Sequence, residues 1–151
     1  MADSLLQVYV HLVFSTYGRV HLLDVKETKE RLFGYMMGVM KKLEAPVLAI
    51  GGGEEHVHIL HRMPKKMNYE ELASRLKSNS SRFAKSMGGR YQKFRWQRGY
   101  AGFSVSRWDI DMIAGYIKKQ ERHHNTEIYK AELERLLKEN DVEYDSRYLW
   151  D

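Results

Sequence analysis

The 151-residue chain contains no cysteine, only two prolines and no long apolar run. Without cysteine, the sequence excludes disulfide bonds, thiolate metal ligands and a cysteine nucleophile, and it fits a reducing compartment. No apolar stretch approaches the roughly 18 residues that indicate a membrane span. The N-terminus lacks the basic region and apolar stretch of a signal peptide. We therefore expect a cytoplasmic protein that has no membrane partner.

The two prolines, Pro46 and Pro64, mark no linker, and no internal repeat interrupts the chain. Hydrophobic residues make up 43% and charged residues 30% of the sequence, which is typical of a globular protein. A chain of this length can bury a substantial core. We predict a single domain that spans residues 1–151.

The net charge of +5 is unevenly distributed. Between Arg62 and Arg98 there are eleven Lys or Arg and two acidic residues, whereas Glu121 to Asp151 holds five basic and nine acidic residues. A basic middle is typical of proteins that bind a phosphate backbone. A solvated helix face is the alternative interpretation of the same charges.

Hydrophobic periodicity divides the chain into strands and helices. Strands are expected at residues 7–16, 46–50, 56–63 and 100–105, and helices at 24–43, 68–87, from 106 onward, and 126–140. Asp24, Asn68 and Ser106 each precede an acidic residue by three positions and are expected to cap the first three helices. This order predicts an α+β fold of the ferredoxin-like or RRM-like type. Its four-stranded antiparallel sheet has helices on one face and the first and third strands at the centre.

The third expected strand begins with His56-Val57-His58. Side chains alternate across a strand, so both imidazoles leave one face, while His61 leaves the other and is no natural third ligand. Two imidazoles on one face can chelate a metal ion. Taken alone the pair is weak, because hydrogen-bonded histidines are common on strands.

Tyr116 and Gln120 are four residues apart on the third expected helix, so they share a face. A tyrosine oxygen can attack phosphorus, and a glutamine carbonyl can complete an oxygen-and-imidazole metal shell. The alternative is a partly buried tyrosine beside a surface glutamine.

Together these motifs resemble the HUH single-tyrosine transposases of the smallest insertion sequences and their repeat-associated relatives. The resemblance rests on His56-Val-His58-Ile-Leu and on Tyr116-Ile-Lys-Lys-Gln120-Glu-Arg-His123-His124. It extends to Tyr9-Val-His11-Leu-Val-Phe-Ser-Thr, Ile50-Gly-Gly, Ser78-Asn-Ser-Ser81 and Trp96-Gln-Arg-Gly-Tyr100-Ala-Gly-Phe103-Ser-Val-Ser106. Glu55 departs from the aspartate that the family often has before the first histidine.

The resemblance implies a DNA transposase of bacterial or archaeal type that cuts and rejoins single-stranded DNA through a 5′-phosphotyrosine. Tyr116 would be the nucleophile, and His56, His58 and Gln120 would hold a divalent metal, Mg²⁺ or Mn²⁺. Imidazole ligands suit Mn²⁺ better than Mg²⁺. His11, Glu55 and His124 are candidates for supporting positions around the ligands.

The family also implies DNA hairpins as substrates and a homodimer in which Tyr116 serves the partner's histidines in trans. Aromatic residues Tyr91, Phe94 and Trp96 interleave with the basic segment and are expected either to stack on bases or to pack in a core. The candidate DNA contacts are Arg75, Lys77, Arg82, Lys85, Arg90, Lys93, Arg95 and Arg98.

Three alternatives stay open. A domesticated relative would cut and join repeat hairpins without moving itself. A non-catalytic RRM-like module would need exposed aromatics on its central strands, where this chain has histidines. A plain metal-dependent nuclease would have no use for Tyr116.

Overall fold

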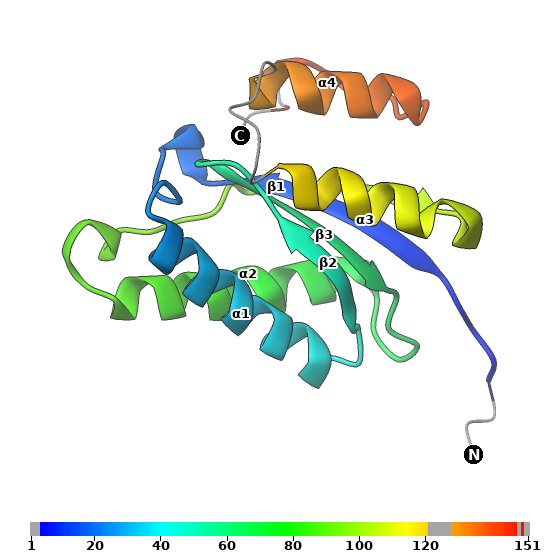
Figure 1. The fold of residues 1–151 in the computed structure, drawn as a ribbon, viewed down its shortest axis with the longest axis horizontal. Coiled ribbons are helices and arrows are strands. Elements are labelled where there is room, and N and C mark those ends of the chain that lie inside the picture. Colours follow the sequence, from blue (N-terminus) through cyan, green and yellow to red (C-terminus); the bar gives the residue numbers. More distant parts are fainter. Residues whose placement is uncertain (1–3, 121–127, 148, 150–151) are drawn as a thin grey trace.

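The computed structural model describes residues 4–120, 128–147 and 149. Four strands form one antiparallel sheet in the order β2-β3-β1-β4, so the first and third strands lie at the centre, as predicted. The strands are β1 (Tyr9–Ser15), β2 (Val47–Gly51), β3 (His56–Arg62) and β4 (Ala101–Val105). Figure 1 shows β3 and β1 crossing the middle of the molecule.

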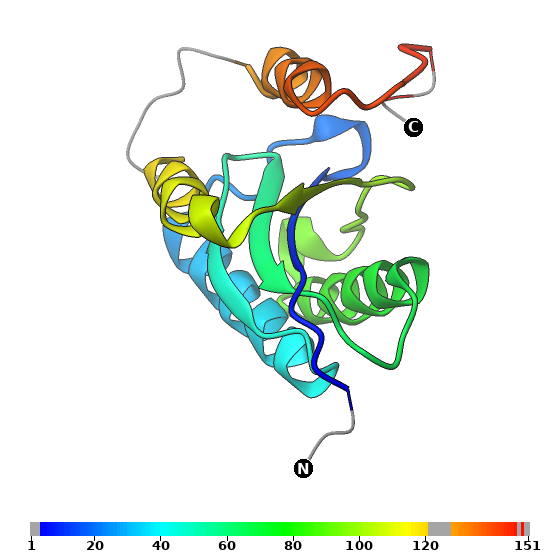
Figure 2. The ribbon, with the colours of Figure 1, turned by 90° about the vertical axis from the view of Figure 1, so that its right-hand side faces the viewer.

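Two layers of helices enclose the sheet (Figures 1 and 2). The helices are α1 (Lys26–Lys42), α2 (Tyr69–Ser86), α3 (Ile110–Lys119) and α4 (Tyr129–Glu139), with 3-10 turns η1 (Tyr17–Arg19), η2 (Gly89–Tyr91) and η3 (Arg107–Asp109). The predicted α+β fold is confirmed, with α1 and α2 as the helices on one face. In addition, α3 and α4 cover the other face, which is consistent with apolar residues on both sides of the central strands.

Each face of the sheet has its own core. Leu12 and Phe14 of β1 point toward α1 and α2, where they join the largest apolar cluster with Leu32, Met36 and Leu76. On the other face, Val13 packs against Leu133, Leu136 and Leu137 of α4. Near β2, Leu60 of β3 packs against Ile117 of α3. The face under α3 and α4 therefore has apolar margins, and the histidines lie between them.

The helix starts follow the capping prediction only in part. Asn68 accepts a hydrogen bond from the Glu71 backbone N–H, as expected. Asp24 does not cap α1: Val25 occupies that position without a side-chain bond, and the Asp24 carboxylate accepts from Arg90 instead. Ser106 caps η3, one short turn before α3. The helix start expected at residue 126 lies outside the described residues, and α4 begins at Tyr129.

The glycines between β2 and β3 allow close packing around the site. A Cβ atom on Gly51 would lie 2.5 Å from the Ile117 carbonyl oxygen of α3. On Gly52 it would lie 2.1 Å from the His56 carbonyl oxygen, and on Gly53 it would lie 2.7 Å from the His56 ring. These distances are shorter than side chains tolerate, so the glycines let α3 and the hairpin approach His56.

Candidate metal and nucleophile site

His56 and His58 lie on the face of β3 that α3 and α4 cover. They are opposite Ser15 and Val13 of β1, and their exposed fractions are only 1% and 0%. Because strand side chains alternate, Val57 between them enters the core beneath α1 and α2. Both imidazoles are thus buried, and they lie on one face of the strand, as the sequence predicts.

Glu132 of α4 joins the two histidines to the α3 residues. Its Oε1 lies 2.9 Å from His58 Nε2 and 3.3 Å from His56 Nε2. Its Oε2 accepts hydrogen bonds from the Tyr116 hydroxyl at 2.5 Å and from Gln120 Nε2 at 2.9 Å. One buried carboxylate therefore contacts all four residues that the sequence singles out for chemistry.

The outer nitrogens of the histidine pair are held by His11 and Glu55. His11 Nε2 lies 2.8 Å from His58 Nδ1, and Glu55 Oε1 lies 2.5 Å from His56 Nδ1. Hydrogen bonds of this kind fix the ring orientation and leave Nε2 for a ligand. The structure places His11 and Glu55 where supporting partners would stand, while His124 lies outside the described residues.

Burial and the neighbouring charges shift the protonation equilibria of the cluster. Burial alone would raise the pKa of Glu132, but the adjacent imidazoles of His56 and His58 hold it well below its usual range. Burial lowers the pKa of His58. Burial and the hydrogen bond to Glu132 raise the pKa of Tyr116. The cluster therefore favours an ionised carboxylate, a neutral His58 and a protonated phenol.

The donor atoms fit a divalent metal ion. Ligand atoms of His56, His58 and Glu132 all lie within 4.8 Å of one another. Among the described residues, His56 Nε2 and Gln120 Oε1 are buried side-chain atoms that lack a hydrogen-bond partner. Such orphaned acceptors are costly unless a cation or a donor satisfies them. Two imidazoles, a carboxylate and an amide oxygen form a set that suits Mn²⁺ and tolerates Mg²⁺.

Tyr116 lies beside this donor set within the same chain. Its ring meets the His58 ring edge to face, with centroids 5.7 Å apart. Arg135 of α4 donates a hydrogen bond from Nη2 to the Tyr116 hydroxyl at 2.9 Å. The hydroxyl is therefore held between the Glu132 carboxylate and the Arg135 guanidinium. One chain brings Tyr116 and the two histidines together, and the trans arrangement stays a prediction for a dimer.

Sequence reasoning missed Glu132 and Arg135. The sequence analysis predicts a helix over residues 126–140 in an acidic segment but assigns no function to any residue of it. A signal was present: Glu132 falls on the apolar stripe of α4 with Tyr129, Leu133 and Leu136, and only 4% of Glu132 is exposed. An acid within the buried stripe of a helix needs a partner, and here the partners are histidines.

The predicted DNA contacts lie on α2 and on the chain that follows it, and α2 covers the sheet face opposite to α3 (Figure 2). Arg75 donates to Glu71 and Arg90 to Asp24, while the Lys77 ammonium is bound by the backbone carbonyls of residues 97–99. Arg82, Lys85, Lys93, Arg95 and Arg98 are exposed. A role in DNA binding stays a prediction for all eight residues.

The aromatic residues of the basic segment are largely core residues. Phe94 is 0% exposed and Trp96 is 7% exposed, and both rings pack edge to face on neighbouring aromatics, Trp96 against Phe14. Trp96 Nε1 donates to Ser80 Oγ at 2.9 Å. Base stacking by Phe94 and Trp96 is therefore wrong, because the sheet face beneath α2 needs these rings as its core. Tyr91 is partly buried.

A ferredoxin-like sheet with a histidine pair on β3 and a tyrosine on the facing helix defines the class of HUH single-tyrosine proteins. The family model of IS200-like transposases matches residues 4–120. The chain belongs to this family. Curated proteins include no matching sequence.

Two solved structures share the fold. One is a protein of Deinococcus radiodurans assigned as a transposase, with 20% identity and a TM-score of 0.62, covering 80% of this chain and 95% of that one. The other is a REP-associated tyrosine transposase bound to a REP hairpin, with 14% identity and a TM-score of 0.59, covering 83% of this chain and 75% of that one.

The family match ends at Gln120, so α4 lies beyond it. Glu132 and Arg135 therefore lie outside the region that the family model matches. Within the described residues, no helix is long and apolar enough to cross a membrane.

Proposed function

We propose that this transposase cleaves and rejoins single-stranded DNA at hairpin-flanked ends, with Tyr116 as the nucleophile. The observation that carries the proposal is the convergence of the Tyr116 hydroxyl, His58 Nε2 and Gln120 Nε2 on one buried carboxylate, all within 2.9 Å of its oxygens. The four groups come from a strand and two helices, which the core holds in place.

In the cleavage step, the Tyr116 oxygen attacks the scissile phosphorus and the 3′-oxygen of the preceding nucleotide leaves. The products are a 5′-phosphotyrosine and a free 3′-hydroxyl. Glu132 Oε2 already accepts the hydrogen bond of the phenol, so it stands where the phenolic proton is released. Arg135 Nη2 lies 2.9 Å from the Tyr116 hydroxyl oxygen and would face the charge that develops on the phosphate.

His56, His58, Gln120 and Glu132 would hold a divalent ion, Mg²⁺ or Mn²⁺. When bound, such an ion polarises the scissile phosphate and lowers the demand on a weak nucleophile. His11 and Glu55 keep the two imidazoles oriented toward it through their Nδ1 atoms. The raised pKa of Tyr116 explains why an attacking phenol needs such help.

Rejoining reverses the first step. A 3′-hydroxyl from another strand attacks the phosphotyrosine, the tyrosine oxygen leaves, and the phosphodiester is restored. The covalent link conserves the energy of the original bond, so no nucleotide cofactor is required. A nuclease that used water would lose that energy, which is why Tyr116 separates the two reactions.

The basic surface of α2 supports a nucleic-acid hairpin as the substrate, because eleven basic and two acidic residues lie between Arg62 and Arg98. The structural neighbour that is bound to a REP hairpin supports the same substrate class. A homodimer is part of the proposal, and β4 supports it because it is an edge strand of the sheet. We treat residues 1–151 as one functional domain.

The alternative of a non-catalytic RRM-like module has less support. Such a module stacks bases on the open face of its central strands. Here α3 and α4 cover that face, and His56 and His58 are buried beneath them, in contact with Glu132 of α4. Whether the protein moves an element or processes chromosomal repeats is decided by the DNA around its gene.

The test is formation of a covalent adduct. The protein is incubated with Mn²⁺ and a hairpin oligonucleotide that carries a 5′ extension, and a denaturing gel separates adduct from free DNA. The wild type should form an adduct, and Tyr116→Phe should form none. Tyr35→Phe is the matched control, because Tyr35 lies on α1 against Phe83, away from the histidines.

Two results would contradict the proposal. Cleavage that persists in Tyr116→Phe without an adduct would indicate a metal-dependent nuclease. Hairpin binding with no cleavage by the wild type would indicate a binding module.

A further inference from the structure

The first residue of α4, Tyr129, lies flat against His56. The two ring centroids are 4.4 Å apart and the ring planes are inclined by only 23°, so the rings are stacked. Both side chains are almost fully buried, with exposed fractions of 4% for Tyr129 and 1% for His56. His58, by contrast, meets His56 edge to face, with centroids 5.0 Å apart. Tyr129 therefore covers the flat side of one imidazole of the pair.

Two other groups hold the edge of the same imidazole. Glu55 Oε1 lies 2.5 Å from His56 Nδ1, and the Gly53 backbone passes so close that a Cβ atom there would lie 2.7 Å from His56 Cε1. A contact at the edge fixes one atom of the ring but leaves its plane less restrained, because the outer torsion of a histidine side chain has a broad energy minimum. A ring stacked on the flat side restrains that plane.

The plane of the His56 ring decides where its outer nitrogen points. His56 Nε2 lies 3.3 Å from Glu132 Oε1, and the ligand atoms of His56, His58 and Glu132 all lie within 4.8 Å of one another. A rotation of the ring about its outer torsion would swing Nε2 away from this shared point. A metal ion needs its ligands in place at the same time, so a restraint on the ring plane acts on metal affinity.

The same helix supplies the stacked ring and the carboxylate. Tyr129 and Glu132 are three residues apart on α4, so their side chains share a face. Leu133 and Leu136 pack with Val13 of β1 and hold this face against the sheet. Because α4 lies outside residues 4–120, which the family model matches, the stacking joins α4 to a motif inside the matched region.

We propose that Tyr129 is a positioning residue for the metal site. Its ring holds the His56 imidazole in the plane that directs Nε2 toward the shared point, and this restraint raises the affinity for the divalent ion. The inference rests on the proposed function, because it takes His56 as a metal ligand. It adds to that function a residue that acts through His56.

The first test measures the stacking without any metal. An aromatic ring above an imidazole moves the imidazole C–H signal upfield in a nuclear magnetic resonance spectrum, and ¹³C-labelled histidine with His56→Gln identifies the signal of His56. Tyr129→Phe keeps the ring and should keep this signal in place. Tyr129→Leu and Tyr129→Met replace the ring by an apolar chain and should move the signal downfield. His61, which is stacked on Tyr69 with planes inclined by 22°, is the internal control, and its signal should not change.

The second test measures Mn²⁺ affinity by electron paramagnetic resonance. Tyr129→Leu should weaken Mn²⁺ binding about tenfold, which is typical when a group that supports a metal ligand is lost. Tyr129→Phe should bind Mn²⁺ as the wild type does, because the ring and not the hydroxyl acts on His56. Rescue by the ring alone separates positioning from a general loss of packing.

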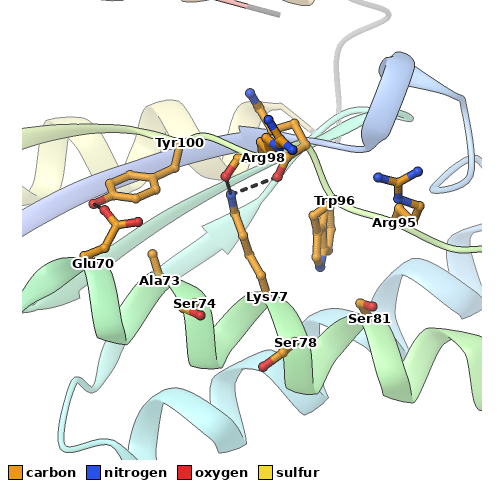
Figure 3. A pocket seen from close by; sticks show the side chains of 11 residues that line it. Glu70, Ala73, Ser74, Lys77, Ser78, Ser81, Arg95, Trp96, Arg98 and Tyr100 are labelled. Carbon is orange, nitrogen blue, oxygen red and sulfur yellow. Dashed lines mark hydrogen bonds between the residues drawn. The ribbon is translucent and has the colours of Figure 1, made fainter. Parts of the chain in front are cut away.

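Two variants control for the loss of an aromatic ring as such. Tyr144→Leu removes a partly buried ring from the apolar cluster that α4 forms with Val13. Tyr100→Leu removes a partly buried ring on the other face of the sheet, where Tyr100 lies beside Glu70 of α2 (Figure 3). Both variants should lower the free energy of unfolding in urea and leave the Mn²⁺ affinity and the His56 signal unchanged.

An unmoved His56 signal or a wild-type Mn²⁺ affinity in Tyr129→Leu would overturn the inference. So would an equal loss of Mn²⁺ affinity in Tyr129→Phe, because the hydroxyl would then be responsible. If both tests succeed while the wild type forms no Tyr116 adduct with a hairpin, the proposed cleavage fails and the positioning role stands. If the wild type binds no Mn²⁺, both fail.

Discussion

The two faces of β3 use the same residue type for opposite purposes. On the α1 and α2 face, both ring nitrogens of His61 are satisfied: Nδ1 donates to the Arg62 carbonyl at 2.8 Å, and Nε2 accepts from the Tyr69 hydroxyl at 2.6 Å. On the α3 and α4 face, His56 and His58 both direct Nε2 toward Glu132 Oε1, at 3.3 and 2.9 Å. What distinguishes a candidate ligand from a structural histidine is a ring nitrogen directed at a point shared with other donor atoms, and not its burial or its strand.

Among the variants considered, the double variant His56→Ala/His58→Ala should have the largest effect on cleavage and on Mn²⁺ binding. Removing both imidazoles leaves only Gln120 and Glu132, so cleavage should be abolished and Mn²⁺ binding, followed by titration calorimetry or electron paramagnetic resonance, should be lost. Affinity for a hairpin should be largely retained, because the basic surface lies across the sheet. His61→Gln, on the other face of the same strand, is the control and should bind Mn²⁺ normally. A large loss of hairpin affinity in the double variant would contradict this division of labour.

Core truncations on the two faces sharpen the comparison. Leu76→Ala shortens a fully buried side chain of α2 and should lower the free energy of unfolding by about 2–5 kcal/mol, measured by urea denaturation. Its Mn²⁺ affinity should stay that of the wild type. Leu133→Ala, on α4 one residue beyond Glu132, should also lower stability but should weaken Mn²⁺ binding as well. If both variants keep wild-type Mn²⁺ affinity, α4 does not hold the donor set.

The fold and the first half of the site could be predicted because their signals are local. The alternation of His56, Val57 and His58 fixes one face, and the spacing of Tyr116 and Gln120 fixes another. Glu132 could not be found in this way, because its partner His58 is 74 residues away in the sequence and only packing brings the two together. For the same reason the sequence left both base stacking and core packing open for Trp96, and only the structure shows that its ring packs in the core.

Glu132→Gln tests whether the carboxylate belongs to the metal site or merely fills it. The substitution keeps the shape of the side chain but removes its charge, so Mn²⁺ affinity should fall at least about tenfold. A loss of this size is typical when a group that supports a metal ion is replaced. Glu134→Gln on the same helix is the control. An unchanged or higher affinity in Glu132→Gln would mean that the carboxylate blocks the ion, and the donor set would then be His56, His58 and Gln120 alone.

The smallest expected effect concerns His61. Burial lowers the pKa of His61, so the folded protein resists its protonation while the unfolded chain takes up a proton near pH 6.5. In the window from about pH 6.5 down to the folded pKa, the unfolded state binds more protons, and the free energy of unfolding must fall as the pH falls. Each unit of pKa difference contributes about 1.4 kcal/mol. His61→Gln should therefore lose less stability between pH 7 and pH 5 than the wild type in urea denaturation. An identical loss in both proteins would show that His61 accepts a proton without cost, and that its face of β3 is less strictly apolar than its packing indicates.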